Sequence, residues 1–522
     1  MTSTAEQQVP EPLLPEERDT VWERWRDALI ADPRRRRHLR WIVPAVLTLL
    51  AAVLRLWNLA HPHALIFDET YYVKDAWTLL NLGYEASWPD GANESFLAGD
   101  ADVFRTDGSF VVHPPLGKWL IALGMLALGP ESGWGWRIAT ALIGSVAVLV
   151  LYLVAKRLTG SMFYAAIAAF LMAIDGLAIV LSRVTLLDTS LMLLVLVAFW
   201  FVLIDRERSL PRIAAALGAH AEDRVVRWGP VLWNRPWVLA AGVALGAATA
   251  VKWSGLYALA GLGVYLVVTD ALARRRAGIA YWPADAVLRQ GPVSFLLLVP
   301  VSVVVYLVSW TGWLVTADGY DRGTHPNALA ALWEYHQAIY NFHVGLTTGH
   351  AYASPAWQWP LLARPTAMYW HSVPAGEDGC TAAGSCVQAI SSVPNPLIWY
   401  AAVAAVLFLA YRFARTREWR YAAVLTGVAI TYVPWLLYPE RTIFQFYTIA
   451  ILPFMLLALM FALRELAGRP HAPTYRRASG QGVVVVFLAI ATLVSAFFYP
   501  VWTGMEVPYD FWRLHNWSPT WV

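Results

Sequence analysis

The chain has 522 residues, of which 58% are hydrophobic and only 14% are charged. This composition is too apolar for a water-soluble domain of that length, so lipid must be the solvent for much of the chain. The net charge of +3 is too small to indicate a nucleic-acid partner, and the distribution of the charges is more informative than their sum.

The chain begins with a polar, Pro-rich stretch that lacks the short basic and then apolar run of a cleaved leader. We therefore expect residues 1–40 to form a flexible cytoplasmic tail. Residues 41–502 contain repeated apolar runs of about 20 residues, the length that crosses a hydrocarbon core, and residues 503–522 would follow as an external tail. The runs predict eleven membrane helices, near residues 41–60, 135–155, 162–181, 186–204, 236–252, 255–270, 292–314, 396–413, 420–438, 442–463 and 482–501.

Basic residues mark alternate connections between these runs, which is typical of cytoplasmic loops. They are Arg34 to Arg37, Arg40, Lys156, Arg157, Arg206, Arg208, Arg212, Arg274 to Arg276, Arg412, Arg415, Arg417, Arg420, Arg476 and Arg477. We therefore expect a multi-pass protein of the cell membrane with its N-terminus in the cytoplasm. The long loops 61–134 and 315–395 would then lie outside.

One apolar run, from Leu116 to Leu128, is too short to cross the bilayer. Counting it as a crossing would invert every later loop against the distribution of basic residues. We expect it to be a helix at the external interface.

The two cysteines, Cys380 and Cys386, both lie in the polar stretch GEDGCTAAGSCVQ of the second long loop. A disulfide is expected if that loop faces an oxidising compartment. Two free thiols are the alternative, because sequence alone does not prove a pairing.

Two adjacent carboxylates, Asp68 and Glu69, follow the first apolar run on the predicted external side. A carboxylate partly shielded from water has a raised pKa, which suits it to take a proton from a hydroxyl. Alternatively, one acid caps the next helix and pairs with Lys74. Arg55, near the end of the same run, either reaches the headgroups or faces a cavity, where it would meet the carboxylates or an anionic ligand.

Further charges recur at the predicted external ends of the apolar runs, at Arg137, Arg183, Asp188, Lys252, Glu440 and Arg441. Each of them alone is as well explained by a local ion pair. Gathered at one depth, they suit a site in which Arg and Lys hold a lipid-linked phosphate while an acid handles a hydroxyl.

Histidines near the first long loop could add to this site. His113, five residues before Lys118, could donate to a phosphate or sugar oxygen. A metal site is the alternative, but His61, His63 and His113 lack the ligand spacing of a zinc site. We therefore expect no bound metal and no other cofactor.

Several short motifs, each weak alone, occur together between residues 50 and 450. They are FDE from Phe67, VHPPLGK ending at Lys118, LLD ending at Asp188, KWSGL from Lys252 and ERTIFQFY from Glu440. In this order the chain resembles the protein O-mannosyltransferases, glycosyltransferase family 39 of the GT-C class. The resemblance implies an all-α polytopic GT-C fold with about eleven transmembrane helices and external loops.

The resemblance also implies a reaction, the inverting transfer of mannose from polyprenyl-phosphate-mannose to Ser or Thr of secreted proteins. Asp68 would be the catalytic base, and Glu69 would position the base or the acceptor. Arg55 and Arg137 would bind phosphate or orient the acids. The other substrate-binding candidates are His113, Lys118, Arg183, Asp188, Lys252 and Arg441.

Partners also follow from the resemblance. They are the lipid-linked donor, unfolded or translocating secreted proteins, membrane lipids and, as a further candidate, the secretion translocon. Eukaryotic members carry a β-trefoil MIR domain in the second long loop, and residues 315–395 are too few to hold one. The chain therefore looks like the actinobacterial members, whose carrier is a polyprenyl lipid.

Two other functions fit parts of the pattern. A GT-C enzyme that modifies a glycolipid or wall polysaccharide would share the composition and the charges. A membrane transporter would also be polytopic, but its charges should lie near the midplane within internal repeats. Mannose on a co-expressed secreted protein distinguishes the first alternative, and solute uptake into vesicles distinguishes the second.

Overall fold

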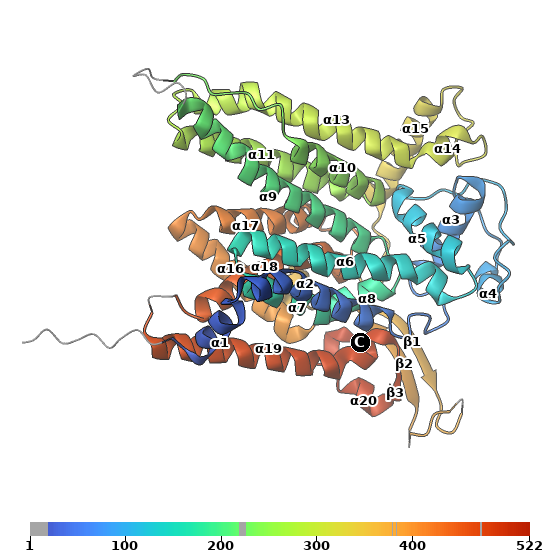
Figure 1. The fold of residues 1–522 in the computed structure, drawn as a ribbon. Helices are drawn as coiled ribbons and strands as arrows, with labels where there is room; N and C mark the ends of the chain where they lie inside the picture. The colour runs from blue at the N-terminus through green and yellow to red at the C-terminus, as the bar shows by residue number, and fades with distance from the viewer. Residues whose placement is uncertain (1–18, 219–225, 378, 383, 470–471) are drawn as a thin grey trace, which may run out of the picture.

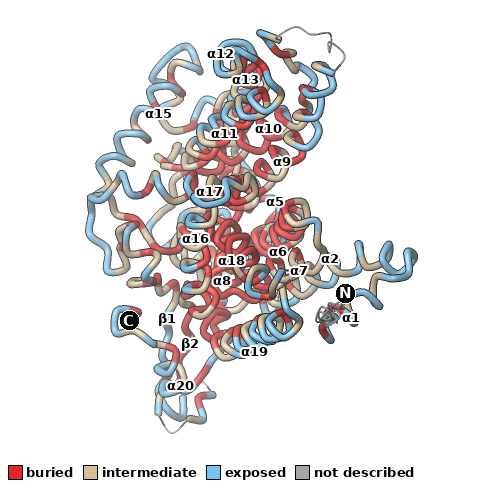
Figure 2. The backbone as a smooth tube through the Cα atoms, turned by 90° about the vertical axis from the view of Figure 1, so that its left-hand side faces the viewer, coloured by how far each residue is buried: buried red, intermediate tan, exposed pale blue. Residues whose placement is uncertain are grey.

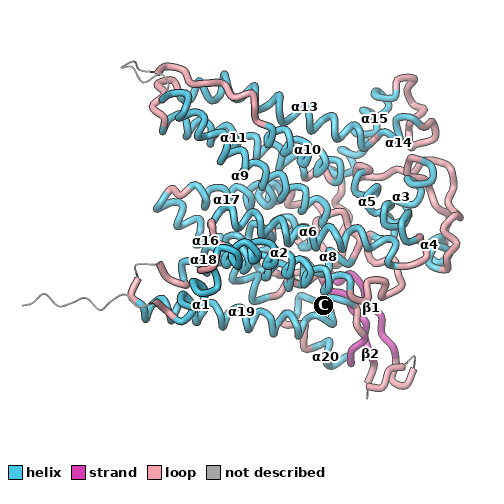
Figure 3. The backbone as a smooth tube through the Cα atoms, viewed as in Figure 1, coloured by secondary structure: helices cyan, strands magenta, loops and turns pink. Residues whose placement is uncertain are grey.

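The computed structural model describes residues 19–218, 226–377, 379–382, 384–469 and 472–522. Long helices run side by side through most of the molecule, and short helices, loops and a small sheet gather at one end (Figure 1, Figure 3). We call this the loop end. It carries Glu69–Leu82 (α3), Ala92–Leu97 (α4), Leu116–Leu128 (α5), Thr311–Val315 (α14), Ala328–Gly345 (α15) and the sheet.

Eight helices of the described chain are long and apolar enough to cross a membrane, and a bent pair of helices makes a ninth candidate. Met162–Ile174 (α7) and Gly176–Arg183 (α8) form the bent pair, with an angle of 56° between them. Six of the eight are single helices: Pro33–Leu56 (α2), Gly133–Thr159 (α6), Asp188–Gly218 (α9), Gly255–Arg276 (α11), Pro396–Thr416 (α16) and Thr474–Thr503 (α19). The seventh, Trp282–Ser309, consists of Trp282–Ala284 (α12), Asp285–Gln290 (η1) and Gly291–Ser309 (α13). The eighth, Trp419–Leu437, consists of Trp419–Tyr432 (α17) and Val433–Leu437 (η3).

Each of the eleven predicted runs contains a helix, but the number of eleven crossings is not confirmed. Pro236–Val251 (α10) has 16 residues and Leu452–Leu466 (α18), preceded by the 3-10 turn Gln445–Ala450 (η4), has 15. Both are short of a full crossing. Because apolarity marks a buried helix as strongly as a lipid-facing one, the sequence does not separate the two cases.

Burial divides the helices into an inner and an outer group. Figure 2 shows buried positions concentrated in α6, α8 and α18, in the middle of the bundle. The outer helices expose large apolar side chains, as α19 does at Val485, Ile490 and Leu493. Exposed apolar side chains along a helix of this length are suited to contact with lipid.

The predicted N-terminal tail is ordered near its end. Residues 1–18 lie outside the described part, but Val21–Ile30 forms a helix (α1). Thr20 and Glu23 close a capping box at its start, and the carboxylate of Glu23 lies 2.6 Å from the guanidinium of Arg477 on α19. A cap and an ion pair therefore fix a helix where composition predicted flexibility.

The fold is not wholly α-helical. Ala367–Val373 (β1), Cys386–Ser391 (β2) and Glu506–Pro508 (β3) form an antiparallel sheet in the order β1-β2-β3. Cys380 and Cys386 are joined by a disulfide with a Cα–Cα distance of 5.7 Å. The C-terminal segment, which also holds Tyr509–Arg513 (α20) and Pro519–Trp521 (η5), packs on the loop end with Trp521 buried, so it is folded.

Candidate active site

The site begins with the FDE segment at the start of α3. Phe67 has a left-handed backbone, with φ of 52°. Its ring lies 5.7 Å from those of Phe444 and Phe446 and 6.1 Å from that of His350. Asp68 is the N-cap residue of α3, but in the described chain its side chain makes no capping hydrogen bond. The capping alternative therefore does not apply to Asp68.

The carboxylate of Asp68 lies in an environment that favours its neutral form. Burial raises its pKa to about 6, and the negative charge of Asp188 adds to this effect. The charge of Lys252 and a hydrogen bond with Tyr72 oppose it. A carboxylate with this pKa is ionised at neutral pH and still basic enough to take a proton, which suits a general base.

Glu69, in contrast, has no free hydrogen-bonding capacity toward a substrate. It is fully buried, and its Oε1 accepts from Arg137 Nε at 2.9 Å and from the Thr185 amide at 2.8 Å. Its Oε2 accepts from Arg137 Nη2 and from the Ile66 amide, both at 2.8 Å. Glu69 therefore holds the loop that presents Asp68.

Arg137 completes this brace. Besides Glu69, its guanidinium donates to the carbonyls of Leu59, Pro62 and Ala64 at 3.2, 3.0 and 2.7 Å. All three guanidinium nitrogens thus have oxygen partners in the protein. Of the two roles expected for Arg137, the geometry supports orienting the acids and leaves no donor for a phosphate.

Arg55 and Arg183 are not where the sequence interpretation put them. Both are buried, and most of their partners are carbonyls that helix ends leave unsatisfied. Arg55 donates to Ser182 Oγ and to the carbonyls of Ala51, Met172 and Ala173. Arg183 donates to the carbonyls of Arg55, Trp57 and Asn58. The expected phosphate contacts are therefore replaced by structural ones at the break between α7 and α8 and at the end of α2.

A cavity of about 920 Å³ lies between α10, α11, α13, α15 and residues 435–441. Its walls are largely apolar and aromatic, with Leu256, Leu259, Val303, Trp333 and Val344 among the lining residues. It also has a polar cluster, formed by His113, Lys252, His343 and Arg441. An apolar chamber with a cationic cluster suits a molecule that has a hydrocarbon chain and an anionic head.

Lys252 and Asp188 form a buried pair at the edge of this cavity. Lys252 Nζ lies 2.8 and 3.1 Å from the carboxylate oxygens of Asp188 and 4.0 Å from the centre of the Tyr447 ring. Lys252 lines the main cavity, and Asp188 lines a small neighbouring one. Asp188 therefore positions Lys252 and neutralises part of its charge, instead of contacting the contents of the main cavity.

Arg441 is held by a histidine instead of a carboxylate. Its Nε donates to the His343 carbonyl, and its Nη2 donates to His343 Nδ1, both at 3.0 Å. His343 Nε2 donates to the Val112 carbonyl at 2.8 Å, which leaves Nδ1 as the acceptor. Burial and the charge of Arg441 lower the pKa of His343 to about 4. Within the described ranges no carboxylate pairs with Arg441, so it brings an uncompensated positive charge to the cavity.

His113 and Lys118 differ from each other in access. His113 lines the cavity and is buried, and its Nδ1 has no hydrogen-bond partner among the described residues. Burial and nearby positive charges lower its pKa well below the usual value, so the ring is neutral. Lys118 does not line the cavity and lies 2.5 Å from Glu85. The expected direct contact of Lys118 with substrate is therefore not supported.

Sequence analysis missed three contributors to this site. His343 lies in α15, within the stretch that the sequence predicted as a long loop, and no motif singled it out. Tyr72, four residues after Asp68, and Asp75, seven after it, share a face of α3 with the base. Helical spacing from Asp68 would have found both of them.

Comparisons with known proteins identify the family of the chain. Residues 45–308 match the model of the dolichyl-phosphate-mannose-protein mannosyltransferase family, and residues 328–521 match the C-terminal four-transmembrane region of protein-O-mannosyltransferase. The polyprenol-phosphate-mannose–protein mannosyltransferase of Mycolicibacterium smegmatis (strain MKD8) is 34% identical over 507 residues, which cover 92% of this chain and 93% of that protein. The Mycobacterium tuberculosis (strain H37Rv) protein of the same name is 32% identical over 500 residues, or 92% of each chain.

Solved structures show the same fold. The Saccharomyces cerevisiae protein O-mannosyltransferase Pmt1-Pmt2 complex bound to the sugar donor matches with a TM-score of 0.70 and 15% identity, over 92% of each chain. The archaeal oligosaccharyltransferase AglB from Archaeoglobus fulgidus matches with a TM-score of 0.52 and 15% identity, over 93% of this chain and 58% of that one. The expected membrane glycosyltransferase architecture is confirmed.

Proposed function

Because the chain belongs to the dolichyl-phosphate-mannose-protein mannosyltransferase family, we propose that it transfers mannose from polyprenyl-phosphate-mannose to Ser or Thr hydroxyls of secreted proteins. One observation supports this most strongly. Lys252 lines the apolar cavity and is also the cation that acts on the carboxylate of Asp68. The same lysine thus links the place for a lipid phosphate to the base.

In the proposed complex the polyprenyl chain occupies the apolar part of the cavity. The phosphate contacts Arg441, Lys252 and His113, which line the cavity together. Arg441 provides the least compensated charge of the three, because Lys252 is paired with Asp188 and the His113 ring is neutral. Arg441 is therefore expected to contribute most to phosphate binding.

The chemical step is a single displacement at C1 of mannose. The acceptor oxygen forms a bond to C1 as its proton passes to Asp68, and the bond between C1 and the phosphate oxygen breaks. The phosphodiester of the donor becomes a phosphomonoester, which gains about one more negative charge at neutral pH. Cations fixed at the phosphate therefore stabilise the departing group more than the bound donor, which is the condition for catalysis. A β-linked donor gives an α-linked product.

The proposed location is the cell membrane, with the loop end outside and the N-terminus in the cytoplasm. The arginine cluster Arg274 to Arg276 at the end of α11 supports this orientation, because basic residues favour the cytoplasmic side. The acceptor would then be an unfolded or translocating polypeptide, and the secretion translocon is a proposed neighbour.

The test is transfer in isolated membranes that contain the full chain. Labelled polyprenyl-phosphate-mannose and an acceptor peptide with Ser and Thr should give label on the peptide that is released by β-elimination. Asp68→Asn should reduce this label by at least about 100-fold. Chelation of divalent cations with EDTA should leave it unchanged, because the proposed mechanism uses only side chains. Label found only on glycolipid or polysaccharide would refute the protein acceptor.

A further inference from the structure

A second buried cluster of charges contacts the backbone of His113 and does not line the cavity. Lys118 on α5 has its Nζ 2.5 Å from Glu85 Oε1 and 3.9 Å from Asp75 Oδ2. The same Nζ donates to the carbonyl of His113 at 3.1 Å. Lys118 and Glu85 expose only 1% and 3% of their side chains, so solvent does not compensate these charges.

The contact between Lys118 and the His113 carbonyl fixes the backbone of the histidine. His113 is followed by Pro114 and Pro115, which restrict its backbone to extended conformations. The ammonium group of Lys118 donates to the His113 carbonyl and lies in ion-pair distance of Glu85 and Asp75. The carbonyl of His113 is held and its ψ angle is restricted. The side chain can therefore move little except by changing its rotamer.

The imidazole of His113 lines the cavity. Its centre lies 5.4 Å from that of His343 and 6.1 Å from that of Tyr72, and its Nδ1 has no partner among the described residues. A buried polar atom without a partner is unfavourable unless a ligand supplies one. Lys252 and Arg441 line the same cavity, and they are the charges that a phosphate would bind. A ring N–H of His113 that reaches the cavity would donate to a phosphate oxygen.

We propose that Lys118, Glu85 and Asp75 are positioning residues that hold His113 so that its imidazole donates a hydrogen bond to the donor phosphate. This inference rests on the proposed function and deepens it. The cluster acts on the donor only through His113, because Lys118 itself does not reach the cavity. Its effect should therefore appear in the binding of the donor and should vanish when the imidazole is absent.

A double-mutant cycle tests this dependence. His113→Ala and Lys118→Met are measured singly and together in the full-length enzyme, as KM for polyprenyl-phosphate-mannose and as kcat. Each single change should raise the donor KM roughly tenfold, and the double variant should resemble His113→Ala alone. Lys118→Arg should restore most of the affinity, since it keeps a donor at this position.

Arg412→Met provides the matched control. Arg412 also forms an ion pair, with Glu465 at 2.9 Å, but it lies on α16 and lines neither cavity. Arg412→Met by itself should leave the donor KM unchanged. The double variant with His113→Ala should show the same donor KM as His113→Ala. A purely structural role of Lys118 would lower the amount of folded enzyme and leave the donor KM of the remainder unchanged.

If Lys118→Met prevents folding, Glu85→Gln replaces it in the same cycle, because it weakens the hold on Lys118 without leaving two carboxylates together. Independent effects of His113 and the cluster, whose fold-changes multiply in the double variant, would overturn the inference. Wild-type enzyme must transfer mannose to peptide in the same assay. If the wild-type enzyme does not transfer mannose to peptide, the proposed function is wrong. If it does, but the fold-changes multiply in the double variant, only this inference is wrong.

Discussion

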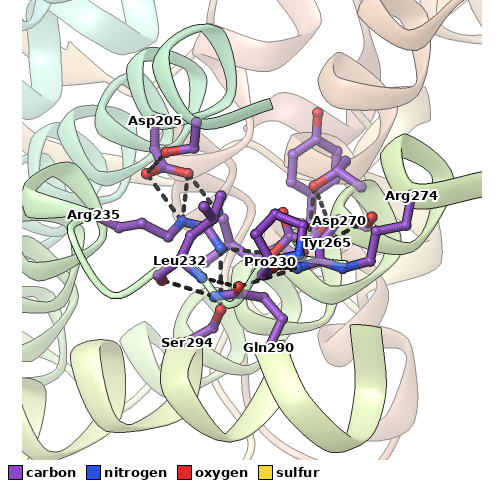
Figure 4. A network of polar contacts seen from close by, with 12 residues as sticks. Asp205, Pro230, Leu232, Arg235, Tyr265, Asp270, Arg274, Gln290 and Ser294 are labelled. Carbon is purple, nitrogen blue, oxygen red and sulfur yellow. Dashed lines mark hydrogen bonds and ion pairs between the residues drawn. The ribbon is translucent and has the colours of Figure 1, made fainter. Parts of the chain in front are cut away.

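Helix α10 has a buried charge network at each of its two ends, and the networks differ in how completely their cations are paired. Arg235 precedes the helix, and Lys252 follows it. At the first end, every guanidinium nitrogen of Arg235 and of Arg274 has an oxygen partner (Figure 4). The partners include the side chains of Asp205, Asp270, Asp285, Gln290 and Ser294.

At the other end of α10 the pairing is incomplete. Lys252 shares its charge with Asp188, but Arg441 has no carboxylate within the described residues and His113 Nδ1 has no partner there. These groups line a cavity instead of filling it. A buried charge that is fully paired stabilises or specifies a fold. A charge or hydrogen-bonding group that lines a cavity without a full set of partners indicates a ligand. Burial of a charge does not by itself identify a functional residue.

The largest effect is expected from Asp68→Asn. The variant keeps the shape of the side chain but removes the proton acceptor, so kcat should fall by about 100- to 10,000-fold. The measurement is mannose transfer from labelled donor to peptide, with the amount of folded enzyme as control. Activity near that of the wild type would exclude Asp68 as the base.

Arg235→Met should affect stability and not catalysis. It leaves Asp205 and Asp270 buried without their cation, which should lower the free energy of unfolding by about 3–5 kcal/mol. Thermal unfolding in detergent should show the loss, while the donor KM of the remaining folded enzyme stays unchanged. A change in donor KM without a loss of stability would contradict the distinction between the two ends.

Arg441→Met should show the opposite pattern. Loss of a charge that contacts the phosphate should lower kcat/KM by roughly 100-fold, in the range reported for single charge-stabilising donors. Stability should change little, because Arg441 leaves no unpaired carboxylate behind. Equal losses of stability for Arg441→Met and Arg235→Met would remove the contrast.

The pH dependence follows from the raised pKa of Asp68, which is about 6. The base acts only when ionised, so kcat/KM should fall about tenfold per pH unit below this value and level off above pH 7. Stability changes in the opposite sense, because the raised pKa favours the protonated folded form and this contribution is lost as pH rises through the folded pKa. Rates and melting temperatures measured from pH 5 to 8 should therefore diverge.

The smallest effect is expected from Asp188→Asn. Asparagine keeps an oxygen near Lys252 but no longer neutralises it, so the donor KM should change by less than about tenfold. Removing the negative charge should also lower the pKa of Asp68, since Asp188 raises it. A shift of the acidic limb of the pH profile toward lower pH would show this coupling, and an unchanged limb would argue against it.

Much of this site followed from the sequence, because charges at apolar run ends are rare enough to stand out. His113, Lys252 and Arg441 line one cavity, and the charge of Lys252 also acts on the carboxylate of Asp68. Arg55 and Arg183 do not line this cavity, because a sequence gives the depth of a guanidinium and not the direction in which it points. Their partners are mainly backbone carbonyls, and backbone carbonyls carry no sequence signal.

The fold was less predictable where the elements are short or depend on distant partners. β3 has three residues and pairs with β2, although more than 100 residues separate them in the chain. No local pattern indicates such a strand. α18 was placed correctly as a helix, but its length and near-complete burial depend on how the surrounding helices pack.

Phe67 connects the segment of Asp68 to aromatic residues that follow much later in the chain. Its left-handed backbone costs about 1 kcal/mol, and the rings of Phe444 and Phe446, made near the end of the chain, stabilise it. A growing polypeptide that has not yet reached those aromatics contains Asp68 but lacks the support that orients it. The segment that carries Asp68 should therefore reach its final conformation only after residues 444–446 have been made and packed.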